Sequence, residues 1–248
     1  MIPHLSSCTR TALANANDGA RGIRYAMRML LRNILEIRDE TPRSAPLNMA
    51  LDEALLASAR APLLRIYRWE RAAVSFGYFG KSAHVAAAWP GREIVRRMTG
   101  GGVVPHGRDL TYSLIVPGDH AFAALSPRDV YRAVHETIAG LLAGNGMTPA
   151  LAARPGRAGT GVCFESPAEF DLLALGKKIA GAAMRRTKRG LLLQGSIQEI
   201  ADLEMLRPRL ASAFATKVIA VKYEPQQFAA AESLAAEKYA TREWTMRV

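Results

Sequence analysis

The sequence predicts an α+β fold, a mixed β-sheet packed with helices. Helical and strand-like stretches alternate irregularly along the chain, and no internal repeat is present. Hydrophobic residues make up 49% and charged residues 22% of the 248 residues, which is typical of a globular domain and excludes a disordered chain. Charged residues interrupt every apolar run before the roughly 18 residues of a membrane-spanning helix, so no membrane contact is expected.

The first 32 residues are predicted to lie outside the fold. Residues 1–32 show little periodicity and are rich in Ala, Asn, Ser and Arg, with Asp18 as their only acidic residue. This composition is like that of a transit peptide, but a flexible extension or a true start at Met27 or Met29 explains it equally well. Residues 33–248 are then expected to form a single domain. Two cysteines are too few for a disulfide framework or a zinc site, which favours a reducing, cytoplasmic location.

The first elements predicted after this segment are a helix and several strands. Apolar residues recur at helical spacing over 47–55, and two β-rich stretches, 64–69 and 73–79, follow around a polar turn and are expected to pair with each other. Residues 93–98 predict a strand that ends in a run of glycines. Alternation over 110–116 predicts the next strand, so a glycine loop is expected to join the two.

The later elements are a helix, two hairpins and two helical stretches. Ser126 supplies an N-cap and Pro127 a first-turn proline to an apolar stripe that stops near Gly144. Strand-like segments separated by short Gly-containing turns predict two successive hairpins, and two amphipathic stretches finish the chain. These strand and helix ranges are 171–175, 179–185, 191–200, 202–213 and 227–240.

The charge is strongly positive. Lys and Arg number 33 against 22 Asp and Glu, a net charge of +11, which favours acidic partners. Residues 177–189 hold a basic cluster without an acidic residue: Lys177, Lys178, Arg185, Arg186, Lys188 and Arg189. It is either a docking surface or a solvated hairpin tip. No nucleic-acid partner is expected, because no helix-turn-helix, zinc-finger or aromatic-basic RNA motif is present.

The segment 96–106 contains three consecutive glycines after two arginines. Glycines let the backbone approach a ligand and direct N–H groups at it, while Arg96 and Arg97 supply charge for a carboxylate or phosphate. The segment is neither a Walker A loop nor a dinucleotide fingerprint. It therefore predicts a site for an anionic or carbonyl ligand, with a plain tight turn as the alternative.

Two further segments carry chemistry. Cys163 lies between a glycine-rich stretch and the basic cluster, where a nearby cation would raise its thiolate fraction, although a lone cysteine can also be an inert apolar residue. Residues 176–183 place two lysines before a run of very small residues. Such a strand leaves room for a thin acyl chain with an ammonium at its carbonyl, or simply permits close packing.

Together these segments resemble the family that contains lipoate-protein ligase A, the lipoyl/octanoyl transferases and, more distantly, the biotin-protein ligases. The resemblance covers residues 44 to about 200. It rests on 48–55, 65–70, 75–79, 96–106 and 176–183. It implies the sheet-based α+β catalytic domain of biotin and lipoyl protein ligases, and therefore a catalytic domain over 33–248.

Residues 163–172 resemble the stretch that bears the nucleophile in cysteine-dependent octanoyltransferases. These enzymes move octanoyl from acyl carrier protein, through a cysteine thioester, to a specific lysine of a lipoyl domain or the glycine-cleavage H protein. The resemblance implies Cys163 as the nucleophile and Lys178 as the lysine near the acyl carbonyl. It implies substrate-binding roles for Arg97, Thr99, Gly100, Gly101, Gly102, His106, Ser75, Gly77, Tyr78, Gly181 and Ala182. Arg185, Arg186, Lys188 and Arg189 would then steer the acidic partner proteins.

A transferase of this type is expected to be a monomer that needs no metal and no cofactor. The first alternative is a lipoate-protein ligase that makes an acyl-adenylate from ATP and Mg²⁺. Ligases usually carry an accessory domain, for which the roughly fifty residues after Ser196 leave no room. The second alternative is a non-catalytic acyl- or carrier-binding protein.

Three positions depart from the family pattern. Gly107 follows His106 where an acidic residue is common, Ala182 replaces a frequent serine, and the segment 193–196 lacks the histidine often found beside its Gly-Ser. The first and third departures leave the choice between an octanoyl and a lipoyl group open.

Overall fold

The computed structural model describes residues 30–153 and 167–247. The strands are β1 (Leu31–Arg43), β2 (Leu63–Trp69), β3 (Ala73–Phe76), β4 (Glu93–Arg96), β5 (Val103–Pro105), β6 (Leu110–Pro117), β7 (Ala150–Leu151), β8 (Leu172–Ala174), β9 (Lys177–Thr187), β10 (Gly190–Ile197) and β11 (Ala215–Ala220). The helices are α2 (Ala45–Ser58), α3 (Ser82–Ala88), α4 (Ala121–Ala124), α5 (Pro127–Ala143), α6 (Leu203–Leu206), α7 (Leu210–Phe214), α8 (Pro225–Leu234) and α9 (Arg242–Met246). A 3-10 turn, η1 (Arg207–Arg209), and a π-helical turn, η2 (Ala235–Tyr239), complete these elements.

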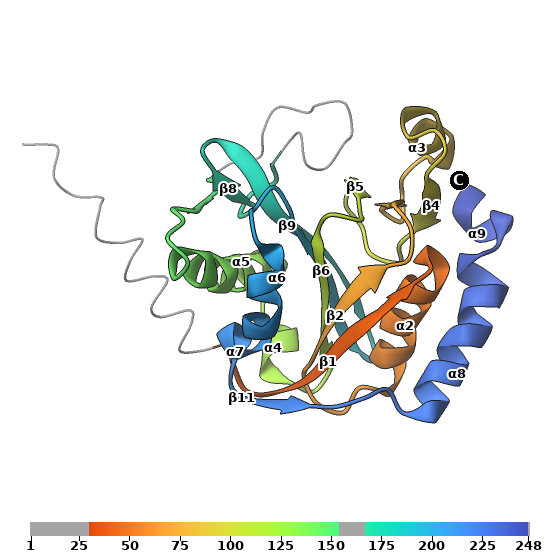
Figure 1. The fold of residues 1–248 in the computed structure, drawn as a ribbon. Coiled ribbons are helices and arrows are strands. Elements are labelled where there is room, and N and C mark those ends of the chain that lie inside the picture. Colours follow the sequence, from red (N-terminus) through yellow and green to blue (C-terminus); the bar gives the residue numbers. More distant parts are fainter. Residues whose placement is uncertain (1–29, 154–166, 248) are drawn as a thin grey trace, which may run out of the picture.

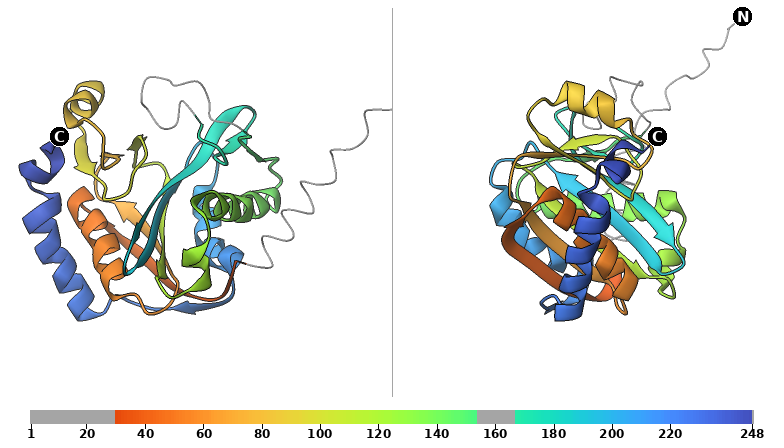
Figure 2. Two further views of the ribbon diagram at one scale, coloured as in Figure 1. Left: turned by 180° about the vertical axis from the view of Figure 1, so that it is seen from behind. Right: turned by 90° about the vertical axis from the view of Figure 1, so that its right-hand side faces the viewer.

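Two sheets organise this part of the chain. An eight-stranded mixed sheet has the order β11-β1-β2-β6-β10-β9-β8-β7, and a three-stranded sheet has the order β4-β3-β5 (Figure 1). Helices α5 and α7 lie on one side of the large sheet, whereas α2 and α8 lie on the other (Figure 2). This is the mixed α+β architecture that the sequence predicts. Among the described residues no helix is long and apolar enough to cross a membrane.

The two faces of the large sheet differ because its strands alternate. Along β6, Tyr112 and Leu114 belong to the apolar cluster under α5. Ser113 between them faces the α2 side, where its hydroxyl donates to the buried Asp52 carboxylate. Along β10, Leu193 lies in the same apolar cluster, and the Gln194 amide donates to the Asp52 carboxylate on the opposite face. The sheet thus has an apolar face under α5 and a polar face under α2.

Most predicted elements are confirmed. Helix α5 is capped by Ser126, whose hydroxyl accepts from the Asp129 backbone N–H at 3.1 Å, and ends before Gly144. Strands β8, β9 and β10 form two successive hairpins. The amphipathic stretch at 202–213 folds as α6, η1 and α7, and the one at 227–240 as parts of α8 and η2.

The expected pairing of the stretches at 64–69 and 73–79 is wrong. Strand β2 pairs with β1 and β6 in the large sheet, whereas β3 pairs with β4 and β5 in the small one. One of the two partners of β2, strand β1, was not predicted by the sequence analysis, because charged Glu36, Arg38 and Asp39 interrupt its apolar residues. Likewise β5 intervenes between the glycine loop and β6. Since β1 begins at Leu31, Leu31 and Arg32 belong to the sheet and not to the excluded segment.

Candidate active site

The glycine loop after β4 is held against the end of β3 by direct backbone contact. The Tyr78 N–H donates to the Thr99 carbonyl at 2.8 Å. A Cβ on Gly77 would lie 2.0 Å from the Gly101 carbonyl oxygen, closer than atoms can approach, and Gly101 itself has a φ of +85°. Gly77, Tyr78 and the glycines therefore build a rigid wall of the site.

The two arginines that precede this loop have different partners. Arg96 and Arg97 are both buried, and strand geometry directs them to opposite sides. The Arg97 guanidinium donates to the Ser75 hydroxyl at 2.7 Å and to the carbonyls of Gly100 and Gly102 at 3.0 and 2.9 Å. Arg96 instead donates to backbone carbonyls of the segments 78–80 and 244–247. Of the two cations expected for a ligand, only Arg97 faces the site.

A narrow cavity of about 40 Å³, room for a water molecule or two, joins many of the predicted residues. Those that line it are Ser75, Arg97, His106, Lys178, Gly181 and Ala182. The sequence analysis did not single out the lining residues Met49, Tyr67, Trp69, Val104, Ala183 and Gly195. Thr99, Gly77, Tyr78 and the three glycines do not line it. Because the cavity holds only a water molecule or two, a larger ligand could enter only if side chains of the lining moved.

Lys178 lies at this cavity as one half of a buried ion pair. Its ammonium is 2.7 Å from the Asp171 carboxylate, and burial raises the pKa of Asp171 while Lys178 opposes that rise. The Ala168 N–H also donates to this carboxylate, at 2.5 Å. A Cβ on Gly181 would lie 2.6 Å from Lys178 Cε, so the small residue makes room for the lysine side chain. Cys163, the predicted nucleophile, lies outside the described residues.

A buried polar network that the sequence analysis missed adjoins the cavity through Gln194. Arg65 donates to Asp52 at 2.8 Å and to the Asn48 side chain at 2.6 Å. Asp52 also accepts from Gln194 at 2.7 Å, and Gln194 in turn accepts from Thr99 at 2.7 Å. Asn48, Asp52 and Arg65 lie in segments that carry the family resemblance. Their sequence signal was available, but only the fold shows that they meet.

Gln194 lies in the segment that departs from the family pattern. Its amide nitrogen donates to the Asp52 carboxylate at 2.7 Å and to the Met49 sulfur at 3.4 Å, and its amide oxygen accepts from the Thr99 hydroxyl. A neutral histidine offers one donor and one acceptor, enough for the bonds to Asp52 and Thr99. The departure therefore keeps the network connected.

A second polar cluster lies at the other end of the cavity. His106 Nε2 is 2.6 Å from the Ser75 hydroxyl, and Nδ1 is 2.8 Å from Asp109 Oδ2. The ring stacks on Trp69 with 4.0 Å between centroids. The hydroxyls of Thr111 and Ser196 also donate to Asp109, at 2.6 and 2.8 Å. His106 is thereby fixed in orientation, and Asp109 is a site residue that the sequence analysis did not name.

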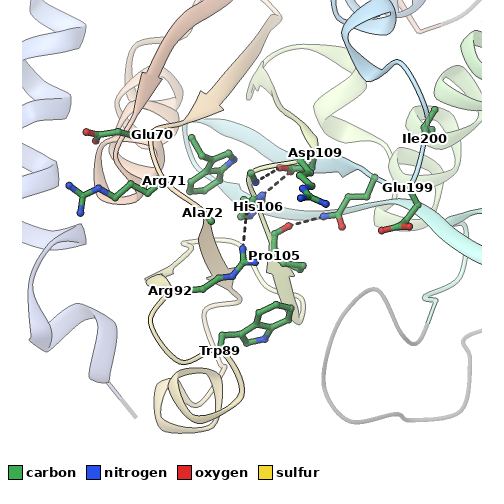
Figure 3. A pocket seen from close by; sticks show the side chains of 14 residues that line it. Glu70, Arg71, Ala72, Trp89, Arg92, Pro105, His106, Asp109, Glu199 and Ile200 are labelled. Carbon is green, nitrogen blue, oxygen red and sulfur yellow. Dashed lines mark hydrogen bonds and ion pairs between the residues drawn. The ribbon is translucent and has the colours of Figure 1, made fainter.

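A larger pocket of about 930 Å³ opens outside the narrow cavity and shares Trp69 and His106 with it (Figure 3). Arg92, whose guanidinium is 3.4 Å from the His106 carbonyl, and Trp89 lie on one side of it. Glu199 and Ile200 lie on the opposite side. Within residues 30–153 and 167–247, no three His, Cys, Asp or Glu side chains gather as a metal site would require.

The basic residues proposed for docking point in different directions. Arg185 donates to the Met98 carbonyl at 3.0 Å and lies over the Tyr78 ring. Arg186 donates to the carbonyl of Leu125, and Arg189 to that of Ala57 at 3.0 Å. Lys188 is exposed at the β9–β10 turn. Strand β9 therefore divides Arg185 and Arg186 between its two faces.

The sequence pattern of the family described as "Lipoyl protein ligase A/B catalytic domain" matches residues 44–237. The chain belongs to this family. Among curated relatives in it, octanoyltransferase LipM of Oceanobacillus iheyensis is 41% identical over 178 residues, 68% of this chain and 65% of that protein. Octanoyltransferase LipM of Staphylococcus aureus is 32% identical over 204 residues, 70% of this chain and 73% of that protein. The match thus spans slightly less than two thirds of the first relative's length.

Solved structures give the same fold for this lipoyl protein ligase A/B family member. Protein Ta0514 from T. acidophilum, a proposed lipoate protein ligase with bound lipoic acid, is 25% identical with a TM-score of 0.67, over 87% of this chain and 99% of that one. Lipoate-protein ligase A bound with ATP is 24% identical with a TM-score of 0.64, over 87% of this chain and 98% of that one. The family and fold class predicted from the sequence are confirmed.

Proposed function

We propose that this protein is an octanoyltransferase of protein lipoylation. It takes an octanoyl group from acyl carrier protein onto Cys163 as a thioester and passes it to a specific lysine of a lipoyl-domain or glycine-cleavage H protein. The observation that carries the proposal is the cavity where Lys178, Arg97 and His106 meet, in a chain whose curated relatives are named octanoyltransferases. The transfer uses no ATP and no metal, because the thioester already carries the activated acyl group.

The residues of the cavity have separate roles in this reaction. The Lys178 ammonium, held by Asp171 at 2.7 Å, stabilises the oxyanion that develops on the acyl carbonyl. Gly181 and Ala182 leave space for the acyl chain, and Arg97 braces the glycine wall opposite them. A thioester on Cys163 divides one transfer between two proteins into two easier steps.

The remaining assignments follow from this reaction. Residues 33–248, together with Leu31 and Arg32 of β1, form the catalytic domain of a cytoplasmic monomer. Arg185, Arg186, Lys188 and Arg189 raise the association rate with acidic carrier and acceptor proteins through long-range attraction, which does not require one contiguous patch.

The decisive test is intact-protein mass spectrometry after mixing the protein with octanoyl acyl carrier protein in the absence of ATP. We expect an adduct of one octanoyl group that neutral hydroxylamine removes and that Cys163→Ala lacks. Lys178→Met is expected to slow transfer roughly 10²- to 10³-fold. Lys177→Met, which changes the exposed neighbouring lysine, should leave it unchanged.

Two results would overturn the proposal. Release of AMP from ATP and free lipoate, without any adduct from the acyl carrier protein, would make the protein a ligase. Binding of the carrier with neither adduct nor AMP would make it a binding protein.

A further inference from the structure

Ser75, His106 and Asp109 form a line of buried side chains in the wall of the cavity. Ser75 Oγ is 2.6 Å from His106 Nε2, and His106 Nδ1 is 2.8 Å from Asp109 Oδ2. Ser75 and His106 are 1% and 6% exposed, and the Asp109 side chain is 1% exposed. The two hydrogen bonds and the stacked Trp69 fix the imidazole ring in one orientation.

The partners of this line decide where the protons are. Arg97 can only donate, so the Ser75 oxygen accepts from it at 2.7 Å and directs its own proton elsewhere. The Asp109 carboxylate accepts from Thr111 and Ser196. Burial alone would raise the pKa of Asp109, but His106 and the hydroxyl donors lower it, so Asp109 is ionised. Nδ1 of His106 therefore carries a proton, and Nε2 is free to accept the proton of Ser75.

His106 lies where the outer pocket and the narrow cavity meet. Ser75 lines the narrow cavity, where Lys178 also lies, whereas His106 lines both that cavity and the outer pocket (Figure 3). A nucleophile that arrives through the outer pocket must pass His106 before it reaches an acyl group beside Lys178. A lysine acceptor arrives as an ammonium, since its ordinary pKa is about 10.4, and cannot attack until it loses a proton.

We propose that Ser75, His106 and Asp109 form the proton relay that activates the acceptor lysine in the second half of the transfer. This inference rests on the proposed function. Ser75 and His106 are catalytic residues in it, and Asp109 is a positioning residue that acts through His106. An imidazole held by a carboxylate and facing a hydroxyl is a general base of the kind found in hydrolases.

The proton count of the step balances. The acceptor ammonium gives one proton to Ser75 Oγ as the Ser75 proton passes to His106 Nε2. The amine then attacks the acyl carbon, and a C–N bond forms. When the tetrahedral intermediate collapses, the C–S bond breaks and the second ammonium proton goes to the leaving sulfur. The products are an amide, a thiol and a protonated His106, which returns its proton to water through the outer pocket.

Several charged groups surround the relay. Asp109 hydrogen-bonds the His106 ring directly. Arg97 of the β4 end acts through Ser75, Arg92 lies at the His106 carbonyl, and the Lys178–Asp171 pair lines the same cavity. The other neighbours, Trp69, Thr111 and Ser196, are uncharged at neutral pH.

The test separates the two half-reactions. Acyl-enzyme is formed from octanoyl acyl carrier protein, isolated, and mixed either with a lipoyl-domain acceptor or with hydroxylamine, an amine already uncharged at neutral pH. Asp109→Asn and Ser75→Ala are both compared with Asp119→Asn, a change of an exposed aspartate. We expect acyl-enzyme formation to change by less than about threefold, transfer to lysine to fall roughly 10²-fold or more, and reaction with hydroxylamine to stay unchanged.

Each other result overturns the relay. An equal loss with lysine and hydroxylamine would mean that the cluster only supports the cavity wall. A comparable loss in acyl-enzyme formation would mean that it serves the nucleophile instead, and unchanged transfer to lysine would exclude any role. These results differ from failure of the proposed function itself, in which the unaltered protein forms no acyl-enzyme.

Discussion

The two faces of the large sheet bury polar groups in opposite ways. On the face under α2, Arg65 and Asp52 are fully buried, and both hydrogen-bond to charged or polar partners. On the face under α5, the Tyr112 hydroxyl is buried with no hydrogen-bond partner among the described residues, and the His135 ring is buried beside the Phe170 backbone. Burial lowers the pKa of His135 to about 4 and raises that of Tyr112, so both stay uncharged at neutral pH.

The polar face under α2 adjoins the candidate site, whereas the face under α5 contributes to the packing of the core. Arg65 and Asp52 are buried where hydrogen-bond partners compensate for the loss of water, and Gln194 connects them to the cavity. On the other face His135 and Tyr112 are buried in their neutral forms, beside the large apolar cluster. Variants on the two faces should therefore fail in different ways.

The largest expected effect is on the polar face. Arg65→Met leaves the Asp52 carboxylate buried without its cation, which should lower the free energy of unfolding by about 3–5 kcal/mol. Urea denaturation measures the change. The control is Arg68→Met, a partly exposed arginine paired with Glu40 and Glu204, for which about 1 kcal/mol or less is expected. Equal effects of the two variants would contradict the contrast between the faces.

The next effect is a pH dependence that comes from the apolar face. The His135 pKa is lowered from 6.5 to about 4, so the unfolded chain binds more protons between these values, and stability falls as pH falls through them. The loss from this residue should approach about 3 kcal/mol near pH 4. His135→Leu should remove that part of the slope in thermal unfolding followed from pH 7 to 4. An unchanged slope would show that His135 does not titrate with folding.

Two glycines give a matched test of the faces. A Cβ on Gly195 would lie 2.2 Å from the Tyr112 ring, whereas one on Gly181 meets the flexible end of Lys178. Gly195→Ala should lower stability by about 1–3 kcal/mol through overpacking in the apolar core. Gly181→Ala should cost little stability but reduce transfer roughly 10- to 100-fold, because it displaces the ammonium. Stability and activity assays on both variants check this, and the reverse pattern would refute it.

The smallest effect is expected for Gln194→His. A neutral imidazole can donate to Asp52 and accept from Thr99, as the amide does. Stability should change by no more than about 1 kcal/mol, the value of one hydrogen bond. Transfer rates with octanoyl and lipoyl donors should keep their ratio. A change in that ratio would show instead that Gln194 selects the acyl group.

The sequence predicted the locally encoded elements well. Helix α5 carries its own cap and stop signal, and the hairpins of β8, β9 and β10 carry their turn residues, so each needs no distant partner to be recognised. Strand β1 was missed because its pattern makes sense only between β2 and β11, which lie far from it in sequence. The pairing of β2 with β3 was wrong for the same reason: a polar turn does not reveal that the chain changes sheets.

The site divides in a similar way. The resemblance to a family brought Ser75, Arg97, His106 and Lys178 together, and the structure places these residues around one cavity. Asp109 was missed because its role depends also on Ser196, which only the pairing of β10 with β6 brings beside it. Arg96 was given the role of its neighbour because residue type alone does not say to which side of a strand a side chain points.

The contact between Gly77 and the glycine loop limits which second mutations could suppress a substitution of Gly77. The obstacle to a side chain at Gly77 is the backbone of Gly100 and Gly101, which every amino acid shares, so no replacement at those two positions can relieve it. A selection for revertants of Gly77→Ala should return glycine at the original codon. In Gly181→Ala the obstacle is the Lys178 side chain, and a second mutation could remove it only by replacing the lysine to which we assign oxyanion stabilisation.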